Sequence, residues 1–586
     1  MDVHKFRATL GQHPLAYMSA EFALDDRLPI YSGGLGVLAG DIVRQADDLE
    51  LPFVAIGLLY KEGYFKQSIT LAGEQKEYYP LLDPADAPIA LVVNTEGQRI
   101  LVKIPMQNRE VVVQIWEYCQ GDASVYLLDM DIPENDQADR SITRRLYPTD
   151  PSIRLLQEMI LGIGGVRTLM QLHIHPSIYH LNESHSAFAI FEIAHHYMEE
   201  YDMSFADAYD YGRQKIVFTN HTLVPAGNEV FIKAMVTEYL ATYAKHLGLP
   251  INDMLAKGET PSSESFSLST LALNMACRMN TVSKLHSVEA KKIWPDKDLP
   301  AITNGVHLPT WVSADLKSQA PDFNIADVQN LDATELWRIH MMAKHRLIDE
   351  VKFQTGRDLK SDVLVMTWAR RIADYKQPEL LFSDMEKLAR LVNNDQPVQF
   401  ILAGKAHPGD AVGHSHIRNI LQAIKQQGLN GHVVFIPNYT IGLSDVLVSG
   451  SDVWINTPQR GAEASGTSGM KAGANGVLQC SISDGWVDEI DLAGIGWTLP
   501  DQNTAAALYQ VIEQDIVPLY YQRENNVPLE WVNRMKQTIA LIWGQFSAKR
   551  MVEEYIDILY RPALELENLQ KHEHNWRRNY RTRQLP

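Results

Sequence analysis

The chain has 586 residues, more than one hydrophobic core usually serves, so two large domains are expected. Its composition of 45% hydrophobic and 21% charged residues is that of an ordinary globular protein. The formal net charge of −19 argues against nucleic-acid and membrane partners, because both reward a basic field. Only residues 571–586 reverse the sign, and a solvated helix end or a partner contact explains them better than a nucleic-acid site.

The cysteines and the apolar segments bear on the compartment. Cys119, Cys277 and Cys480 are widely spaced and match neither a metal site nor a disulfide framework, so a cytoplasmic location is expected. The N-terminal stretch MDVHKFRATLGQH lacks the apolar core of a signal peptide. The most apolar segments, such as 155–172, carry charges and glycines and are too short to predict a membrane span.

The first half of the chain predicts strands and helices in alternation, with insertions. Residues 15–22 are expected to form a strand, 32–50 a glycine-rich turn entering a helix, and 51–60 another strand. The alternation in ILVKIPM and VVVQIW predicts an antiparallel hairpin over Arg99–Tyr118. Farther on, SIYHLNES and KIVFTNHT are strand ends that deliver polar residues.

In the second half, short β-branched runs alternate with amphipathic stretches such as Pro378–Val392 and His416–Gln427. Alternation of this kind predicts a parallel sheet with helices on both faces. The expected strands are Asp362–Ala369, Val398–Gly404, His432–Ile436, Asp452–Asn456 and Gly476–Ser481.

The expected fold class is therefore α/β, with two Rossmann-like domains that face each other and a crossover near Asn304–Trp311. The expected domain boundaries are an N-terminal domain over 1–305, a C-terminal domain over 306–545 and a helical crossover or tail over 546–586. Ligands of open α/β sheets bind beyond the carboxyl ends of the strands, and most polar clusters of this chain follow expected strands. One active site in the cleft between the domains is expected.

The densest signal is the segment Glu463-Ala-Ser-Gly-Thr-Ser-Gly-Met-Lys471, which follows an apolar strand. Its small residues let the backbone approach a ligand closely and present N–H groups to an anion at a helix start. Alone, the pattern is better explained by a helix start with a solvated lysine. Lys471 differs from a surface lysine in its uncharged neighbours, and a desolvated lysine has a lowered pKa and a usable amine.

Two further clusters suit anions. Arg370, Arg371 and Lys376 close an expected strand and could hold phosphate, although a basic helix start with Asp374 as counterion is an equal interpretation. The turn SGGLG could receive an anion through the N–H groups of Gly33 and Gly34, and packing alone would also explain it.

Asn182-Glu183 with His185, and Asn220-His221, lie at strand ends with apolar flanks. Each is explained by a satisfied buried network, but sugar recognition also needs such fixed donors and acceptors. HLNESH lacks the histidine spacing of a zinc enzyme, so no metal site is expected.

Together these segments closely resemble the α-glucan (glycogen, starch, maltodextrin) phosphorylases, in their short bacterial-type branch. That family has the two-domain GT-B glycosyltransferase architecture. The matching pieces occur in family order from about residue 15 to 490: SAEF, IYSGGLGVLAGD, LLYKEGYFKQ, HLNESHSAF, VFTNHTLVPAG, NTVSKLH, ITNGVHLPTW, RRIADYK, AGKAHPGD and EASGTSGMKAGANG.

The resemblance implies a pyridoxal 5'-phosphate (PLP) cofactor on Lys471, with Thr467, Ser468 and Arg370 at its phosphate and Tyr439 close by. It implies that Gly34 of the Gly33-Gly34 turn binds the substrate phosphate with Arg371 and Lys376. The glucosyl unit would be held by Glu463, Ser465, Gly466, Asn280 and His221, and His185 would lie near the glucan path.

The activity that the resemblance implies is reversible phosphorolysis of an α-1,4-glucan or maltooligosaccharide by inorganic phosphate. The product would be α-D-glucose 1-phosphate, formed with retention. A phosphate monoester with a second pKa near 6 can pass a proton at neutral pH, and the nearby cations offset the repulsion between two phosphates.

Several departures from the family are visible. The chain is shorter than the animal and plant members and shows no regulatory N-terminal extension, which puts control by phosphorylation or a nucleotide in doubt. Arg370 stands where many members have lysine, and GTSGMKAGANG differs in its middle. Glucan length preference and a homo-oligomeric state stay open. The rival hypotheses are a nucleotide-sugar-dependent glycogen or starch synthase of the same fold and a non-catalytic glucan-binding protein.

Overall fold

The computed structural model describes residues 3–222, 230–262, 264–426, 429 and 431–566. The basic stretch 571–586, and the end of the predicted tail from residue 567 onward, lie outside the described residues. Within those ranges, no helix combines the length and the apolar character that crossing a membrane requires.

The first sheet has nine strands, of which six are parallel. Taken from one edge, the parallel strands come in the chain order third, second, first, fourth, fifth, sixth, which is the strand order of the Rossmann fold. They are β8 (Ala123–Asp129), β2 (Phe53–Leu58), β1 (Leu15–Met18), β9 (Ile178–Asn182), β10 (Ile216–Thr219) and β13 (Arg278–Asn280).

An antiparallel extension completes this sheet. The predicted hairpin over Arg99–Tyr118 is confirmed as β6 (Leu101–Met106) and β7 (Arg109–Gln120), which pair antiparallel, and β7 also pairs with β8 and with β5 (Ala90–Leu91). The helices of this part are α1 (Val3–Leu10), α2 (Gly34–Asp48), α3 (Gln137–Arg140), α4 (Pro151–Met159), α5 (Gly165–Gln171), α6 (Ala189–Tyr201), α7 (Phe205–Gly212), α8 (Lys233–His246), α9 (Ile251–Leu255), α10 (Leu268–Met275) and α11 (Lys284–Ile293).

The second sheet has six strands, all parallel, again in the Rossmann order. All five strands predicted in this half are confirmed within two residues at either end, and β19 was not predicted. The strands are β16 (Val433–Ile436), β15 (Val398–Ala403), β14 (Leu364–Ala369), β17 (Val453–Asn456), β18 (Leu478–Ile482) and β19 (Gly496–Leu499).

The helices of the second part differ from the prediction in two places. The stretch Pro378–Val392 is not one helix, because the Asp384 side chain caps a new helix by accepting from Lys387 N–H. The predicted helix His416–Gln427 corresponds to a helix that begins earlier, at Ala411, and ends at Ile424, and Gln427 lies outside the described residues. The helices are α12 (Leu308–Trp311), α13 (Ala314–Gln319), α14 (Ile325–Asn330), α15 (Ala333–Thr355), α16 (Met385–Asn393), α17 (Ala411–Ile424), α18 (Ile441–Gly450), α19 (Ser468–Gly473), α20 (Thr504–Val511), α21 (Val517–Tyr521), α22 (Leu529–Gln545) and α23 (Ala548–Tyr555).

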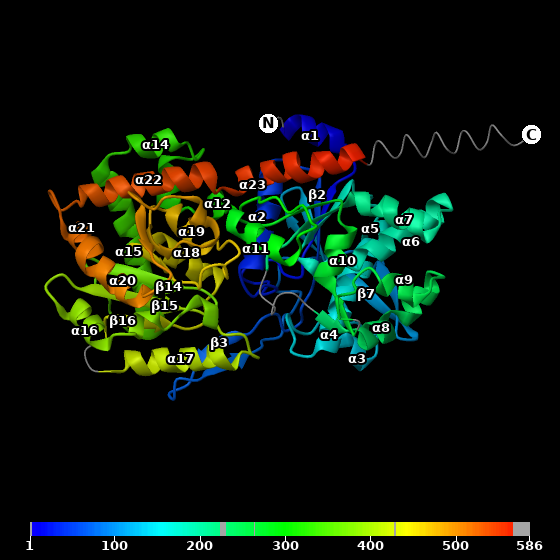
Figure 1. Cartoon of the computed structure of the whole chain (residues 1–586), viewed down its shortest axis with the longest axis horizontal. Coiled ribbons are helices and arrows are strands. Elements are labelled where there is room, and N and C mark those ends of the chain that lie inside the picture. The colour runs from blue at the N-terminus through cyan, green and yellow to red at the C-terminus, as the bar shows by residue number, and fades with distance from the viewer. Residues whose placement is uncertain (1–2, 223–229, 263, 427–428, 430, 567–586) are drawn as a thin grey trace, which may run out of the picture.

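Each sheet lies in its own hydrophobic core. One core collects buried residues between Phe6 and Ile302 together with residues of α23 and the turn after it, and the other collects residues between Val306 and Phe546. Figure 1 accordingly shows two groups of elements side by side, with α22 over one and α23 extending along the other. The chain crosses between the cores near residue 305, where the crossover was predicted.

The crossover is held by α23. Arg550 donates to the carbonyl oxygens of Thr303 and Asn304 at 2.7 and 3.0 Å. A Cβ at Gly305 would lie 2.3 Å from the Ser547 carbonyl oxygen, so only glycine allows this approach. The return of the chain through α23 therefore fixes the position of the Asn304 backbone.

A small hairpin crosses from the first group to the second. Strands β3 (Lys66–Ile69) and β4 (Gln75–Tyr78) carry two buried glutamines that bond to backbone beyond the second sheet. Gln67 donates to the Gly404 carbonyl oxygen and accepts from Asn438 N–H, while Gln75 exchanges two hydrogen bonds with the Ala406 backbone. Figure 1 shows this hairpin beside α17.

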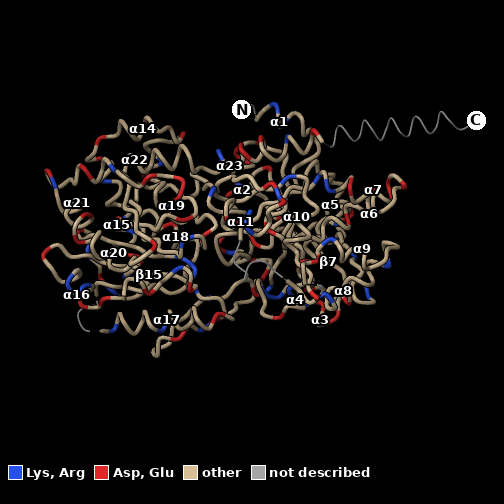
Figure 2. Tube along the Cα trace, viewed as in Figure 1, with Lys and Arg blue, Asp and Glu red and all other residues tan. Residues whose placement is uncertain are grey.

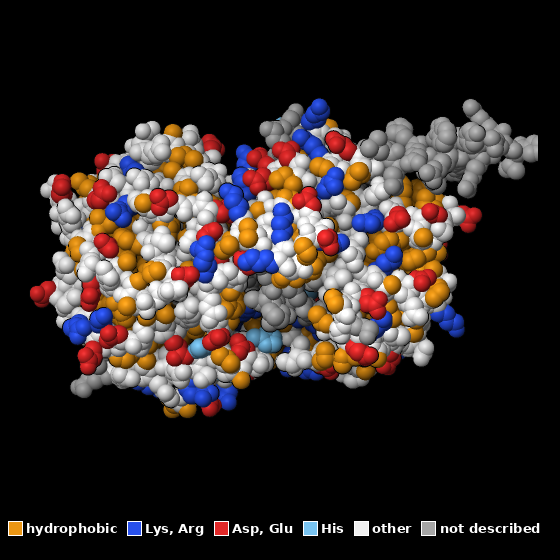
Figure 3. Space-filling view, viewed as in Figure 1, with side chains coloured by type: hydrophobic (Ala, Val, Ile, Leu, Met, Phe, Trp, Pro, Cys, Tyr) orange, Lys and Arg blue, Asp and Glu red, His pale blue; other side chains and the backbone are white. Residues whose placement is uncertain are grey.

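Charged residues are distributed over both groups. Segments with Lys and Arg alternate with segments with Asp and Glu along the whole described trace (Figure 2). On the face seen in Figure 3, hydrophobic, acidic and basic side chains are mixed, and the surface is hollowed where the two groups of elements meet.

The second core contains a buried ion pair. Lys344 of α15 is fully buried and donates to Asp452 at 2.5 Å, to the Val363 carbonyl oxygen and to Tyr520, while His340 lies 2.7 Å from the other Asp452 oxygen. Asp452 immediately precedes β17 and also accepts from Val365 N–H in β14. The network therefore ties α15 to the two central strands of the second sheet.

We predict that Lys344→Met lowers the free energy of unfolding by about 3–5 kcal/mol, because it leaves a buried carboxylate without its main cation. Urea unfolding followed by circular dichroism measures the loss. Lys352→Met on the same helix is the control, since its side chain is 58% exposed and its ion pair with Asp358 contributes at most about 1 kcal/mol. Equal losses in the two variants would contradict the prediction.

Candidate active site

The first cluster lies where the strand order of the second sheet reverses, between β14 and β17. Arg370 directly follows β14, Lys376 follows one turn later, and Glu463 lies in the loop after β17. Lys376 Nζ donates to both Glu463 oxygens at 3.1 and 2.8 Å, and Arg370 donates to one of them at 3.3 Å. Ligands bind at this reversal in open α/β sheets.

Glu463 is a charged carboxylate in this setting. Burial acts to raise its pKa, but the charges of Lys376 and Arg370 outweigh burial and hold the pKa at about 2. Arg370 has a further N–H group that could bind a ligand, because its Nε is buried and has no hydrogen-bond partner among the described residues. Arg371, unlike Arg370 and Lys376, does not bond to Glu463 in the described chain. Its side chain is exposed and donates to the Tyr375 hydroxyl at 3.4 Å.

Lys471 lies on α19, at the end of the glycine- and serine-rich segment. The segment turns through Gly466 at a φ of 72°, a conformation that favours glycine, and a Cβ at Gly469 would lie 2.6 Å from Gln479 Oε1. The Lys471 side chain is buried, and its Nζ lies 4.2 Å from the centre of the Trp311 ring. Burial lowers the pKa of Lys471 to about 8.

The other residues predicted around a cofactor have these contacts. Ser468 Oγ accepts from Trp454 Nε1 at 3.2 Å, and Tyr439 donates to Ser444 at 3.0 Å. Thr467 is the N-cap residue of α19, without a side-chain cap bond. Burial raises the pKa of Tyr439, while its bond to Ser444 and the Arg370 charge act to lower it. Ser465 Oγ is buried and has no partner in the described part of the chain.

The second cluster lies where the first sheet reverses, between β1 and β9. Glu21, just beyond β1, accepts from Ser32 N–H at 2.6 Å, from Gly33 N–H at 3.2 Å and from the Tyr147 hydroxyl at 2.8 Å. The anion at the Gly33 N–H is therefore a carboxylate of the chain itself, which the sequence did not predict. A Cβ at Gly34 would meet nothing within 4 Å, so the next position stays open to a ligand.

Glu183, beyond β9, joins two strand ends. Its carboxylate accepts from His221 N–H at 2.8 Å and from the Asn220 amide at 3.4 Å. Its backbone has a φ of 68°, a left-handed conformation that costs of the order of 1–3 kcal/mol and persists where the surroundings enforce it. Burial raises the pKa of Glu183 to about 8, although four hydrogen bonds act to lower it.

Several buried polar atoms between β9 and the crossover have no hydrogen-bond partner within the described ranges. They are Asn182 Oδ1, Asn220 Oδ1, His221 Nε2, His286 Nε2 and Asn304 Oδ1. Buried polar groups are nearly always paired, so such a group of orphans favours a ligand that completes them. His185 is buried there too, with its ring 6.0 Å from the ring of Tyr147.

Asn280 differs from the other predicted sugar ligands. Its Oδ1 accepts from Thr219 at 2.6 Å and its Nδ2 donates to the Thr281 carbonyl oxygen at 2.9 Å, so both ends of the amide are used within the chain. Asn304 offers the free acceptor instead, and sequence reasoning used that residue only as a crossover marker. The sequence did offer a signal for Asn304, because the segment ITNGVHLPTW places it between the polar strand ends of the first part and the second sheet.

The loop that carries part of the first cluster contacts the first part of the chain. Ser283, which follows β13 of the first sheet, donates to the Ala464 carbonyl oxygen of the second part at 2.5 Å. Lys284 N–H and the Thr303 hydroxyl both donate to Glu489 Oε1, at 2.9 and 2.7 Å. The loop that carries Glu463 and Ser465 is thus bonded directly to the first part.

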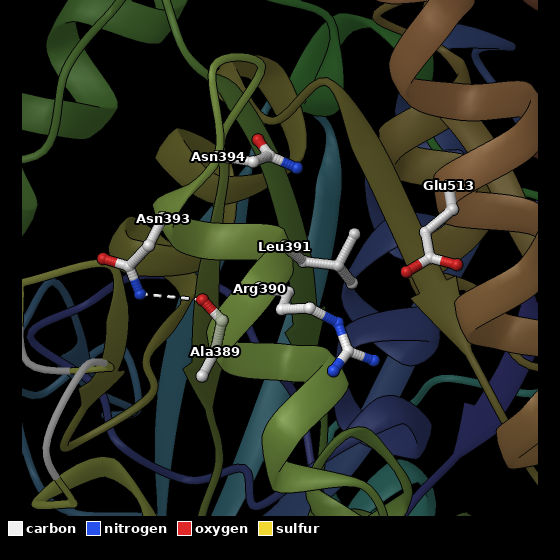
Figure 4. Close-up of a pocket in the computed structure, with 6 residues that line it drawn as sticks. All are labelled: Ala389, Arg390, Leu391, Asn393, Asn394 and Glu513. Carbon is white, nitrogen blue, oxygen red and sulfur yellow. Dashed lines mark hydrogen bonds between the residues drawn. The ribbon is translucent and has the colours of Figure 1, made fainter.

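A surface pocket lies elsewhere. It is lined by the end of α16 and by Glu513 of a π-helical turn, and Figure 4 shows the Asn393 amide bonded to the Ala389 carbonyl oxygen at its rim. None of the predicted site residues lines it. The pocket is therefore separate from both clusters.

Residues 129–494 match the family described as carbohydrate phosphorylase. The chain belongs to the carbohydrate phosphorylase family. It is 37% identical to a maltodextrin phosphorylase of Thermococcus litoralis, over 94% of this chain and 71% of the relative. It is 33% identical to a glycogen phosphorylase of Aquifex aeolicus over 97% and 89%, and 34% identical to one of Mycobacterium tuberculosis over 94% and 71%. The resemblance to this family is thus confirmed.

In this carbohydrate phosphorylase we predict a pH-dependent stability from Glu183. Its pKa is raised from 4.5 to about 8 in the folded chain, so the folded form binds the proton more tightly. Its contribution to stability is full below pH 4.5 and is lost as the pH rises toward about 8, at up to about 1.4 kcal/mol per pH unit.

Glu183→Gln, which imitates the protonated form, is expected to flatten the decline in thermal unfolding temperature between pH 5 and 8. The exposed Glu96→Gln is the control and should keep the slope of the unaltered chain. A Glu183→Gln slope that equals the control slope would refute this assignment.

Proposed function

We propose that the chain is an α-glucan phosphorylase. It would carry out reversible phosphorolysis of an α-1,4-glucan or maltooligosaccharide by inorganic phosphate, giving α-D-glucose 1-phosphate with retention. Family membership and relatives named as maltodextrin and glycogen phosphorylases support the reaction class. The cations around Glu463 and the unpaired polar atoms of the first part support the substrates.

The observation that carries the proposal is the state of Lys471. Its amine is buried, has a pKa of about 8 and finds no hydrogen-bond or ion-pair partner among the described residues. Such an amine suits a covalent bond to an aldehyde, because the neutral form is accessible near neutral pH. A lysine that paired a nucleotide diphosphate would instead need to stay charged beside other cations.

The residues present fit PLP. Lys471 would tether it, and Thr467, Ser468 and the buried, unpartnered Arg370 Nε would hold its phosphate, with Tyr439 nearby. When bound, the cofactor supplies a phosphate group whose second pKa near 6 lets it exchange a proton at neutral pH.

The residues of the chain then have distinct tasks. Lys376 and Arg371, with the open Gly34 position, would bind the substrate phosphate and offset the repulsion between two phosphates. Glu463 neutralises Lys376 and Arg370 in this structure, and a bound phosphate would replace Glu463 as their anionic partner. The released carboxylate, with Ser465, Gly466, His221 and Asn304, could then pair the glucosyl hydroxyls, while His185 would lie near the glucan path.

The same proposal covers the architecture. Two Rossmann-like domains, 1–305 and 306–545, would form the GT-B arrangement with the active site in the cleft between them, and residues from 546 onward would return to the first domain. The two separate cores and the Arg550 contacts support this division. A cytoplasmic location is proposed from Cys119, Cys277 and Cys480, which form no disulfide.

The decisive experiment is phosphorolysis of maltooligosaccharides of graded length, with and without added PLP. Release of glucose 1-phosphate that depends on inorganic phosphate supports the proposal and measures the preferred chain length. Glucosyl transfer from a nucleotide sugar, without a PLP absorbance band, would favour a synthase. Glucan binding without either reaction would favour a binding protein.

We predict that Lys471→Ala loses both the PLP absorbance band and phosphorolysis while keeping the circular dichroism spectrum of the unaltered chain. The physical reason is that the tether is removed but no buried partner is left unpaired. Lys405→Ala is a control, since that lysine is part-buried and bonds to the carbonyl oxygen of Phe65, the residue before β3. Full turnover of Lys471→Ala without added cofactor would refute the proposal.

We also predict that Lys376→Met lowers kcat/KM for phosphorolysis by about 100-fold or more, because a preorganised cation at the phosphate site is lost. Lys387→Met, a partly exposed lysine on α16, should stay within about twofold of the unaltered enzyme. Steady-state rates at varied phosphate concentration separate the two variants. Comparable losses in both would argue against a phosphate site at Lys376.

A further inference from the structure

One chain of contacts links the first core to Lys471 without passing through the two clusters. It begins at Asp41 on α2, the helix whose first turn carries Gly34. Asp41 is 1% exposed, and both of its oxygens accept from Trp311 Nε1, at 3.0 and 2.9 Å. The face of the Trp311 indole then meets Lys471 Nζ at 4.2 Å from the ring centre.

Among the described residues, the indole face is the contact that this geometry gives the Lys471 ammonium. The indole face carries partial negative charge and attracts an ammonium within about 6 Å of the ring centre, more strongly when the site is desolvated. Trp311 is 1% exposed, so water does not compete for this contact. The orientation of the ring, in turn, is set by the bond from its N–H to Asp41.

We propose that Asp41 is a positioning residue for the proposed reaction: it anchors the Trp311 indole so that the ring holds the Lys471 amine in place for the cofactor. The inference rests on the proposed function for its role, but the contacts themselves do not. It assigns a task to two residues that the sequence had placed only within matching segments.

The charges around Lys471 support this arrangement. Burial lowers the pKa of Lys471 to about 8, the Asp41 charge acts to raise it and the Arg44 charge acts to lower it. Arg44 lies 3.6 Å from Asp41 and donates to the carbonyl oxygens of Ala23 and Leu24. Asp41 thus acts on the lysine in two separable ways, through its charge and through the ring.

Competitive acetylation of the full-length chain, freed of bound cofactor, tests the proposal. Mass spectrometry of the Lys471 peptide measures the pH midpoint at which the amine becomes reactive, and Lys471→Ala identifies the signal. The midpoint of the unaltered chain is expected near pH 8. Trp311→Leu removes the ring that favours the charged form, so its midpoint should fall by about half to one pH unit.

Two variants of Asp41 separate its roles. Asp41→Asn removes the charge but keeps an acceptor for the indole N–H, whereas Asp41→Leu removes both. The midpoint of Asp41→Leu should lie below that of Asp41→Asn by about the shift that Trp311→Leu shows alone. In a Trp311→Leu background the two Asp41 variants should coincide, because no ring remains to be positioned.

Equal midpoints for Asp41→Asn and Asp41→Leu, with Trp311 intact, would overturn the positioning role, as would an unshifted midpoint in Trp311→Leu. Trp311→Phe, which keeps a ring but offers no N–H, serves if the leucine variant does not fold, and its midpoint should also fall. The labelling uses no cofactor, phosphate or glucan. Failure of phosphorolysis with the expected midpoints would therefore reject the proposed function and leave the contact chain standing.

Discussion

The candidate site depends on one constraint: cations that are to hold phosphates must be kept together in a buried place before any phosphate arrives. Lys376 and Arg370 are both buried, and they would repel each other without an anion. Glu463 supplies that anion from the loop after β17. Because strand order reverses between β14 and β17, the loops that follow these strands can converge on one point.

In the first part of the chain, buried carboxyl groups also organise the loops beyond the sheet, but their partners include backbone N–H groups. Glu21 collects backbone N–H groups at the glycine-rich turn, and Glu183 collects the backbone of the next strand end. Carboxylates of the chain thus shape the loops beyond both sheets. The unpaired atoms that remain, such as Asn304 Oδ1 and His221 Nε2, mark where a polyhydroxylated ligand could complete the network.

Contacts between the two parts place these loops against each other. Ser283 bonds to Ala464 beside Glu463, and Trp311 connects Asp41 of α2 to Lys471 of α19. Arg550 on α23 holds the crossover that carries Asn304. These contacts bring segments that are far apart in the sequence against each other.

The sequence by itself predicted the α/β class and five of the six strands of the second sheet from local periodicity, and it named candidate residues from short segments in family order. Only the tertiary structure decided which side chains are already satisfied. Asn280 uses both ends of its amide, Gly33 N–H is taken by Glu21, and Asn304 keeps a free acceptor. Hydrogen-bond pairing between residues far apart in the chain has no local signature, which is why these distinctions, and the link from Asp41 to Lys471, required the fold.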